Sequence, residues 1–449
     1  MTIRDCFSSA LLCVALHALA SAQTDEPPRE WIDPATGHRV VRLSNEPGSQ
    51  SLYFHNYPFS ADGRKMAFTV NRGISCVDLV TREVAEVVPG PVQLLMTGRK
   101  TGDAFYLQNG QVKAANLDTH ETRVVVDLPE QFRAKMSEDA IERWRRRAER
   151  NGWPPPTPEM LRSFGWGNIA INADETMVVG IGSDPDGQEQ PRTPPDGSQP
   201  VGGLAPRWAS GRPLVLYTVD VASGEARAIH HSHDWLNHLQ CSPTDPEQIL
   251  FCHEGPWHFV DRTWIIRADG SGLTQVHPRT INMEIGGHEF FGQAGKWVWY
   301  DLQTPRSMVF WLAGYEIETG ARRWYHLTRE QWSVHYNVSP DGKLFCGDGG
   351  GPGSVANRTA NNEEFDTPQN GQWMYLFRPE DGRREGLRPD DRQLIEYGEF
   401  HAERLVDLSQ HDYDLEPNGI FTPDGKWIVF RSNMHGASHV YMVEVAKAE

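Results

Sequence analysis

The chain has 449 residues, of which 39% are hydrophobic and 23% are charged, and its formal net charge is −17. This composition is typical of a globular protein and excludes a disordered chain. An acidic surface disfavours nucleic acid and anionic membranes, so we expect neither as a partner. An anionic ligand is compatible with this charge only at a site where cations gather.

The first 22 residues have the features of a secretory signal peptide. Arg4 precedes an apolar run over residues 7–19, and Ala-Ser-Ala at 20–22 is a small-residue cleavage pattern. The run is shorter than the about 20 residues that a membrane anchor needs. We therefore expect cleavage after residue 22, a single domain over residues 23–449, and a periplasmic or secreted protein.

Four cysteines remain after this cleavage, namely Cys76, Cys241, Cys252 and Cys346. Their wide spacing is not that of a disulfide framework or of a CxxC metal site. Cys241 and Cys252 could meet across a hairpin or remain two buried thiols, and the sequence leaves both alternatives open.

One unit recurs along the chain: an apolar strand, a turn of the Ser-Pro-Asp-Gly kind and a second apolar strand. Such turns between alternating apolar runs predict β-hairpins. The copies lie at residues 59–70, 171–181, 241–252, 291–302, 338–348 and 421–432, with a degenerate copy at 105–117. Outer strands after Thr-Gly or Ser-Gly turns separate the hairpins. Seven such units predict an all-β, seven-bladed β-propeller, and a two-sheet sandwich is the alternative.

Residues 35–44 match the outer-strand pattern, and we expect them to complete the last blade, whose inner strands come from residues 418–446. This pairing would close the ring. Three insertions interrupt the repeat. The pattern over residues 129–162 predicts a short helix that ends at three consecutive prolines, whereas residues 183–213 and 352–371 are predicted to be loops.

Polar side chains occupy one equivalent position in six of the repeats, four residues before the turn Ser or its counterpart. They are Asn56, Asn168, His238, His288, His335 and Asn418. The first strand of each propeller blade lines the central channel, so a polar ring is expected at one mouth. The Asn side chains could simply bond neighbouring backbone groups, but three His in successive repeats favour a functional site.

Loops of the later repeats are expected to reach the same mouth. The polar side chains that they bring are His253, His258, Arg262, Gln410, His411 and Arg431. Imidazole nitrogens together with an amide oxygen suit a divalent ion such as Mn²⁺. Cations near the ring also meet the requirement for an anionic ligand, and His238, His253 and Arg431 are candidates for holding the substrate.

Long strings in the second half of the chain resemble the oligogalacturonate lyase family, most densely over residues 230–445. They are NHLQCSPTDPEQILFCHEGPWHFVDRTWIIRADG, GGHEFF, YDLQTP, FWLAGYEIETG, WSVHYNVSPDGKLFCGDGG and HDYDLEPNGIFTPDGKWIVFRSNM. The resemblance implies a seven-bladed propeller that cleaves digalacturonate or a short oligogalacturonate by metal-assisted β-elimination. It also implies Mn²⁺ as the cofactor and a 4,5-unsaturated uronate as the product.

The resemblance implies roles for individual residues. His288 in GGHEFF looks like the family's catalytic base, Arg262 in VDRTW like its assisting arginine, and His335 in SVHYN like one metal ligand. The family's other ligands are a Gln and two His before the LEPN segment. Here only Gln410 and His411 offer those residue types, so they complete the expected metal site.

Two rival interpretations remain open at this point. The same carboxylate chemistry would serve a lyase for another uronate polymer, and the export signal and the insertions leave the uronate and its chain length undecided. A non-enzymatic periplasmic scaffold resembling TolB would share the hairpin repeat. A scaffold does not need His at three successive channel positions with flanking Arg, so we favour the pectic lyase. The sequence does not determine the oligomeric state.

Overall fold

The fold is known from a computed structural model, which describes most of the chain after residue 25. The described ranges are 26–134, 165–194, 204–367, 370–382 and 394–448, with scattered single positions between them. The predicted signal peptide (1–22) lies outside the described residues. Most of the helix predicted within residues 129–162 also lies outside them, although the scattered positions described between 138 and 149 are helical. A separate 3-10 turn, η1 (Glu130–Phe132), precedes them.

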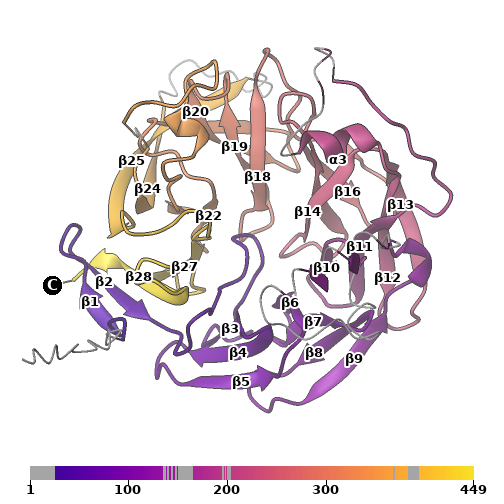
Figure 1. Cartoon of the computed structure of the whole chain (residues 1–449), viewed down its shortest axis with the longest axis horizontal. Helices are drawn as coiled ribbons and strands as arrows, with labels where there is room; N and C mark the ends of the chain where they lie inside the picture. Colours follow the sequence, from indigo (N-terminus) through magenta and orange to yellow (C-terminus); the bar gives the residue numbers. More distant parts are fainter. Residues whose placement is uncertain are drawn as a thin grey trace, which may run out of the picture.

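Strands make up nearly all of the regular structure, and their sheets stand in a ring around a central axis (Figure 1). The first two sheets in chain order are antiparallel, with strand orders β3-β4-β5 and β6-β7-β8-β9. Their strands are β3 (Lys65–Val70), β4 (Gly73–Asp78), β5 (Val84–Val88), β6 (Gln93–Thr97), β7 (Ala104–Gln108), β8 (Gln111–Ala115) and β9 (Thr122–Asp127).

The next two sheets are four-stranded and antiparallel, with consecutive strands as neighbours. Their strands are β10 (Ile169–Ile171), β11 (Met177–Ser183), β12 (Leu214–Asp220), β13 (Ala226–Ser232), β14 (Trp235–Cys241), β15 (Gln248–Glu254), β16 (Thr263–Arg267) and β17 (Thr274–Gln275).

An eight-stranded sheet follows, in the order β18-β19-β20-β21-β25-β24-β23-β22. Each half is a four-stranded antiparallel unit, and the two halves meet where β21 and β25 pair in parallel. The strands are β18 (Ile285–Phe291), β19 (Trp297–Gln303), β20 (Phe310–Glu316), β21 (Arg322–Leu327), β22 (Tyr336–Val338), β23 (Phe345–Gly347), β24 (Trp373–Asp381) and β25 (Ile395–Asp407).

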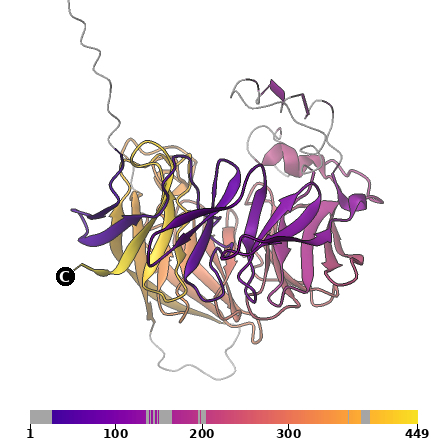
Figure 2. The same cartoon turned by 90° about the horizontal axis from the view of Figure 1, so that it is seen from below.

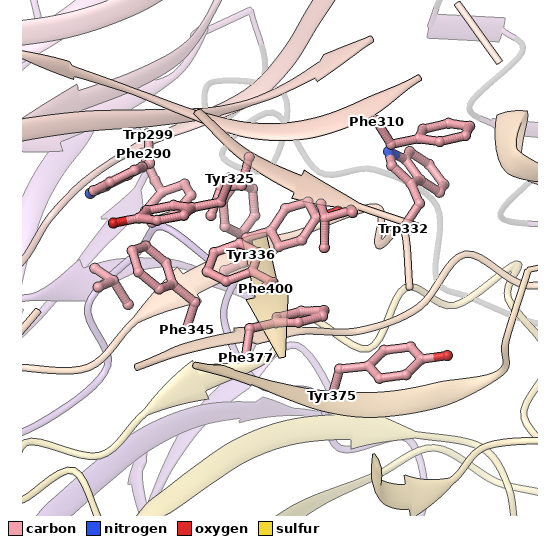
Figure 3. Close-up of a cluster of buried hydrophobic side chains, with 14 of the residues drawn as sticks. Phe290, Trp299, Phe310, Tyr325, Trp332, Tyr336, Phe345, Tyr375, Phe377 and Phe400 are labelled. Atoms are coloured by element: carbon pink, nitrogen blue, oxygen red, sulfur yellow. The ribbon is translucent and has the colours of Figure 1, made fainter. Parts of the chain in front are cut away.

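Aromatic side chains fill the space between the two halves of this sheet (Figure 3). Tyr325 of one half stacks on Phe400 of the other at 4.8 Å between ring centroids, and Trp299 meets Phe345 edge-on at 4.9 Å. Each fully buried ring of this size contributes about 1.5–3 kcal/mol through removal from water. The core therefore lies between neighbouring units of the ring as well as within them.

The last sheet joins the two ends of the described chain, in the order β1-β2-β28-β27-β26. Its strands are β1 (Glu30–Ile32), β2 (His38–Arg42), β26 (Ile420–Phe421), β27 (Trp427–Ser432) and β28 (His439–Lys447). β2 pairs antiparallel with β28, outside the strands from the C-terminal hairpin. This confirms the predicted closure of the ring by an N-terminal outer strand.

The predicted hairpin turns have the expected geometry. Gly63, Gly295, Gly342 and Gly425 have φ values of 70–72°, a left-handed conformation that glycine adopts without steric cost. In three of these turns the preceding Ser or Thr hydroxyl donates a hydrogen bond of 2.6–2.7 Å to the turn aspartate. The same local chemistry thus builds each turn.

The degenerate copy at residues 105–117 forms the predicted hairpin. Asn109 and Gly110 both have positive φ, as a type I′ turn requires. This hairpin is the middle pair β7–β8, and the inner strand is β6, which precedes it. The hairpin was predicted from the sequence, but β6 was not, because the turn between β6 and β7 does not have the sequence of the repeat.

The insertion at residues 183–213 contains a short helix, α3 (Ala205–Ser210), where only a loop was predicted. It lies on one face of the ring (Figure 2). The described residues of the insertion at 352–371 contain the 3-10 turn η2 (Val355–Asn357) and an isolated bridge between Arg358 and Glu364. Cys241 and Cys252 are free thiols. No helix within the described residues has the length and apolar character needed to cross a membrane.

Candidate functional site

Strands of successive units carry histidines to the axis with an unusual backbone. The pairing register shifts at His238 in β14 and at His288 in β18. Their φ values are +49° and +46°, and the equivalent Asn418 before β26 has +57°. A left-handed conformation costs a non-glycine residue on the order of 1 kcal/mol or more, and such strain is concentrated at functional sites. The bulges direct these side chains toward the centre of the ring.

The imidazoles of different units lie in contact. The ring centroids of His288 and His335 are 4.7 Å apart, and those of His238 and His288 are 5.9 Å apart. A fourth imidazole, His55, lies 5.8 Å from His238. Tyr53 contacts three of these rings, at 4.9–5.7 Å. Tyr53 and His55 belong to the loop before β3, which reaches into the middle of the ring (Figure 1). We call these four His and Tyr53 the axial cluster.

The axial cluster keeps two of its imidazoles uncharged. Burial, followed by the charges of His335 and Arg262, holds the pKa of His288 well below its usual range. Burial and the neighbouring His238 lower the pKa of His55 to about 3. The Nδ1 atoms of both rings are buried and accept or donate no hydrogen bond among the described residues. His288 is therefore a neutral imidazole with an unpaired nitrogen at physiological pH.

A buried charge network supports one side of the cluster. The Arg262 side chain is almost fully buried, and it donates to Glu254 at 2.6 Å and to Glu289 at 3.2 Å. His238 lies 3.3 Å from Glu289 and 3.4 Å from the guanidinium. Burial opposes ionisation of Glu289, but Arg262 and His238 outweigh it and lower its pKa. The charges compensate one another, as buried ions must.

His335 is oriented by a carboxylate on the opposite side. Its Nδ1 lies 2.8 Å from Asp348, so the proton on that atom is donated to the carboxylate. Its Nε2 faces the Tyr53 hydroxyl at 3.1 Å and a Glu416 oxygen at 3.7 Å. A histidine held by a carboxylate through one nitrogen is the arrangement in which the other nitrogen binds a metal.

A second group could also contribute metal ligands. Atoms of His238, Cys252 and Glu289 lie within 4.8 Å of one another. The guanidinium of Arg262 already lies against two of them, and its positive charge would repel a divalent ion. Burial also raises the pKa of the Cys252 thiol well above its usual value, which disfavours the thiolate that a metal needs. We therefore regard the His335 side as the better metal site.

With the fold and this geometry established, comparison with known proteins identifies the family. A model of the family described as oligogalacturonate lyase matches residues 163–448, which is more than half of the chain. The chain belongs to the oligogalacturonate lyase family.

Individual members of the family match over nearly the whole chain. The oligogalacturonate lyase of Dickeya dadantii is 25% identical and that of Pectobacterium atrosepticum 24%, each over 92% of this chain and 95% of the relative. A solved oligogalacturonate lyase in complex with manganese has a TM-score of 0.65 at 21% identity and covers 93% of this chain and 96% of its own. The enzyme from Vibrio parahaemolyticus gives 0.65 at 20% identity, with the same coverage. These two structures support the propeller fold.

Several of the site residues predicted from the sequence lie together. His238, His288 and His335 are members of the axial cluster, and Arg262 contacts His238. Arg431 lies beside Glu416, because the Arg431 Nε donates a hydrogen bond of 2.7 Å to the Glu416 backbone carbonyl. The repeat alignment thus selected three histidines that share one place in the fold.

Three other predicted residues lie apart from the cluster or are engaged elsewhere. Gln410 is exposed. Both ring nitrogens of His411 have partners, the Ser432 hydroxyl at 2.9 Å and the Leu415 carbonyl. His253 pairs with Asp234 at 2.9 Å and stacks on Trp264, away from the axis.

His55, Tyr53, Glu416 and Asp348 were not among the residues predicted from the sequence. His55 directly precedes Asn56, the position that the repeat alignment selected, and this neighbourhood is the signal that could have found it. Glu416 and Asp348 have no local signal, because each acts only through its distance to His335.

Proposed function

We propose that this protein cleaves short oligogalacturonates by metal-assisted β-elimination, releasing a 4,5-unsaturated uronate. Family membership supports a lyase acting on pectic oligosaccharides. The observation that carries the mechanism is a neutral His288 in contact with His335, which a carboxylate orients for metal binding. We also propose seven blades, since the two halves of the eight-stranded sheet count separately beside the other five sheets.

The residues around His335 fit a divalent ion, most simply Mn²⁺. His335 Nε2 and the Glu416 carboxylate would hold it, a mixed nitrogen and oxygen set that suits Mn²⁺. A related structure contains manganese. We propose Glu416 in place of Gln410 and His411, because the Glu416 carboxylate lies 3.7 Å from His335 Nε2, whereas Gln410 is exposed and the His411 nitrogens lie against Ser432 and Leu415. When bound, the ion supplies positive charge that neutralises the sugar carboxylate and stabilises the enolate-like charge.

The side chains of the axial cluster would carry out the proton transfer. His288 accepts the C5 proton on its unpaired nitrogen, since a neutral imidazole is the basic form. The positive charge of Arg262 is close enough to His288 to contribute to its lowered pKa. The same charge would stabilise negative charge that develops on a sugar bound beside His288. His238 and Arg431 border this space and are proposed to hold the substrate.

The activity is tested directly with digalacturonate. The purified protein and Mn²⁺ should produce an unsaturated uronate that absorbs in the ultraviolet, and a chelator should abolish this until Mn²⁺ is restored. Uronate oligomers from other polymers serve as the comparison and should react more slowly. Full turnover by a metal-free sample would refute the metal-assisted mechanism, and a preference for another uronate would refute the substrate.

The role of His288 is tested by replacing it. His288→Ala should lower kcat by at least about a hundredfold, because general-base catalysis contributes about 10²–10⁴-fold, while the bound Mn²⁺ per chain remains at the wild-type level. His401→Ala is the matched control, since His401 is exposed on β25 and pairs only with Glu380. Near-wild-type turnover of the His288 variant would exclude it as the base.

We propose that the protein acts outside the cytoplasm, on the basis of the basic start and the apolar run in residues 1–22. The mature protein is expected to begin at Gln23. N-terminal sequencing of protein recovered from the periplasm or the medium checks this, and recovery of the uncleaved chain from the cytoplasm would contradict it.

A further inference from the structure

A pocket of about 570 Å³ lies on the face of the ring that carries α3. Its polar and aromatic lining includes Arg207, Arg212, His233 and Trp235, and none of the described residues that line it is acidic. The two arginines have no carboxylate beside them in the described lining, although the chain as a whole has a net charge of −17. The pocket is therefore a local site of positive charge.

The pocket is close to the axial cluster. Trp235 is the first residue of β14 and His238 the fourth, so the two are about 10 Å apart along the strand. Trp235 is also the register partner of Glu254, which binds Arg262. The pocket thus lies at the first residue of β14 and the cluster at its middle, a separation that an oligosaccharide would span.

The insertion that forms the pocket is fixed to the wall of the site. Trp208 and Ala209 of α3 pack against Phe259 and Val260 in the loop between β15 and β16. Trp257 in the same loop meets His288 edge-on, at 6.1 Å between ring centroids. Backbone hydrogen bonds from residues 190 and 192 to residues 211 and 209 close the base of the insertion. The backbone that carries Arg207 and Arg212 is consequently tied to the loop that contacts His288.

The two arginines are free to bind an anion. The Arg207 guanidinium lies 3.5 Å from the centroid of the Trp235 ring and forms no ion pair with a described residue. Arg212 has only Glu189 at 3.8 Å, with both side chains largely exposed, and such a pair contributes little. A larger cleft of about 1050 Å³ near the N-terminal strands does not offer unpaired basic side chains of this kind. Its basic residues Arg64, Lys65 and Arg82 are each paired with a carboxylate.

We propose that this pocket is a distal subsite that binds the carboxylate of a further uronate residue, so that the enzyme prefers oligomers longer than the dimer. The inference rests on the proposed function and adds a chain-length preference to it. Arginine binds carboxylates through two parallel hydrogen bonds, and the stacked guanidinium of Arg207 is already oriented for this. A dimer cleaved at His288 extends by one sugar residue to each side of the scissile bond, whereas a longer chain extends further toward the pocket.

The subsite is tested by turnover of oligomers of increasing length. Arg207→Gln and Arg212→Gln, made separately, should lower kcat/KM for tri- and tetragalacturonate by about tenfold, the effect of losing one charge-assisted hydrogen bond. Digalacturonate turnover should stay unchanged. Arg227→Gln is the matched control, because Arg227 lies on the outer strand β13 and bonds only a backbone carbonyl. An equal loss for all lengths, or no loss for any, would overturn the subsite.

A binding measurement separates this inference from the proposed function. Calorimetric titration of the His288→Ala protein, loaded with Mn²⁺, with tri- and digalacturonate needs no turnover. The trimer should bind more tightly than the dimer, and Arg207→Gln in this background should remove the difference. If the wild-type protein cleaves no galacturonate but this difference is found, the lyase proposal fails and the subsite stands. Equal affinity for the two ligands would refute the subsite whatever the activity.

Discussion

The hydrogen bond between His335 and Asp348 shows how a single contact prepares a ligand. One Asp348 oxygen accepts from the His335 backbone N–H at 2.9 Å and the other lies 2.8 Å from its Nδ1, so backbone and ring are held together. The Asn418 backbone N–H donates to the same carboxylate at 3.1 Å. Three hydrogen bonds, two from His335 and one from Asn418, thus end on one carboxylate. The bond to Nδ1 determines the tautomer of the imidazole.

Asp348→Asn should weaken Mn²⁺ binding by about 10–100-fold, the usual effect of removing a carboxylate that orients a metal-binding histidine. Titration calorimetry with Mn²⁺ measures this without any substrate. Asp341→Asn is the control, since Asp341 accepts its hydrogen bonds in an exposed hairpin turn. Unchanged Mn²⁺ affinity in the Asp348 variant would place the metal elsewhere.

At the scale of elements, the position of β18 depends on the loop before it. Glu284, fully buried, accepts hydrogen bonds from the backbone N–H groups of Thr280 and Ile281 at 2.6 and 2.9 Å. His277 lies 2.7 Å from its other oxygen. Burial would raise the pKa of Glu284, but His277 and the two N–H groups outweigh it and lower the pKa to about 2. This carboxylate closes the loop that leads into the strand of His288.

The low pKa of Glu284 makes stability depend on pH. Because the pKa in the folded state lies below that of the unfolded chain, ionised Glu284 stabilises the protein above about pH 4.5, and this stabilisation is lost as pH falls toward 2. Glu284→Gln should lower the free energy of unfolding by about 1–3 kcal/mol at pH 6. Thermal unfolding at pH 6 and pH 3 should show the difference from wild type shrinking at the lower pH. The exposed Glu318→Gln is the control, and a pH-independent difference would contradict the assignment.

At the scale of the whole molecule, pairing of β2 with β28 joins the two ends of the chain. Val40 and Val41 in β2 and Leu43 just after it are fully buried, and the valines pack on opposite sides of the last sheet, in two different hydrophobic clusters. A ring of sheets has exposed edges unless its ends meet, and this N-terminal strand covers the edge of β28.

Deletion of residues 23–44 should therefore destabilise the whole ring. Loss of three buried aliphatic side chains alone should lower the free energy of unfolding by about 4 kcal/mol or more. Scanning calorimetry of the truncated and full mature proteins measures the change. Deletion of residues 23–25, which leaves the ion pair between Glu26 and the buried Arg42 intact, is the control and should have little effect. Unfolding at the wild-type temperature after the longer deletion would show that the ring does not depend on this strand.

The features predictable from the sequence are those with a local or periodic cause. Asp-Gly turns specify hairpins because left-handed backbone at one residue is a local requirement, and Gly63, Gly295, Gly342 and Gly425 satisfy it. The recurring position four residues before the turn brought His238, His288 and His335 to attention because equivalent positions of a repeat meet at its axis. The outer-strand pattern of residues 35–44 likewise predicted how the ring closes.

The remaining features depend on distances between segments far apart in the chain, which no local pattern encodes. The residue types in the segment before LEPN pointed to Gln410 and His411, but tertiary structure leaves the first exposed and surrounds the second with Ser432 and Leu415. It brings Glu416 to His335 and His55 to His238 instead. Whether a side chain can act as a ligand or a base is decided by which partners packing places within hydrogen-bonding distance. That is a property of the assembled ring, whereas the strands and turns from which it is built follow from the sequence.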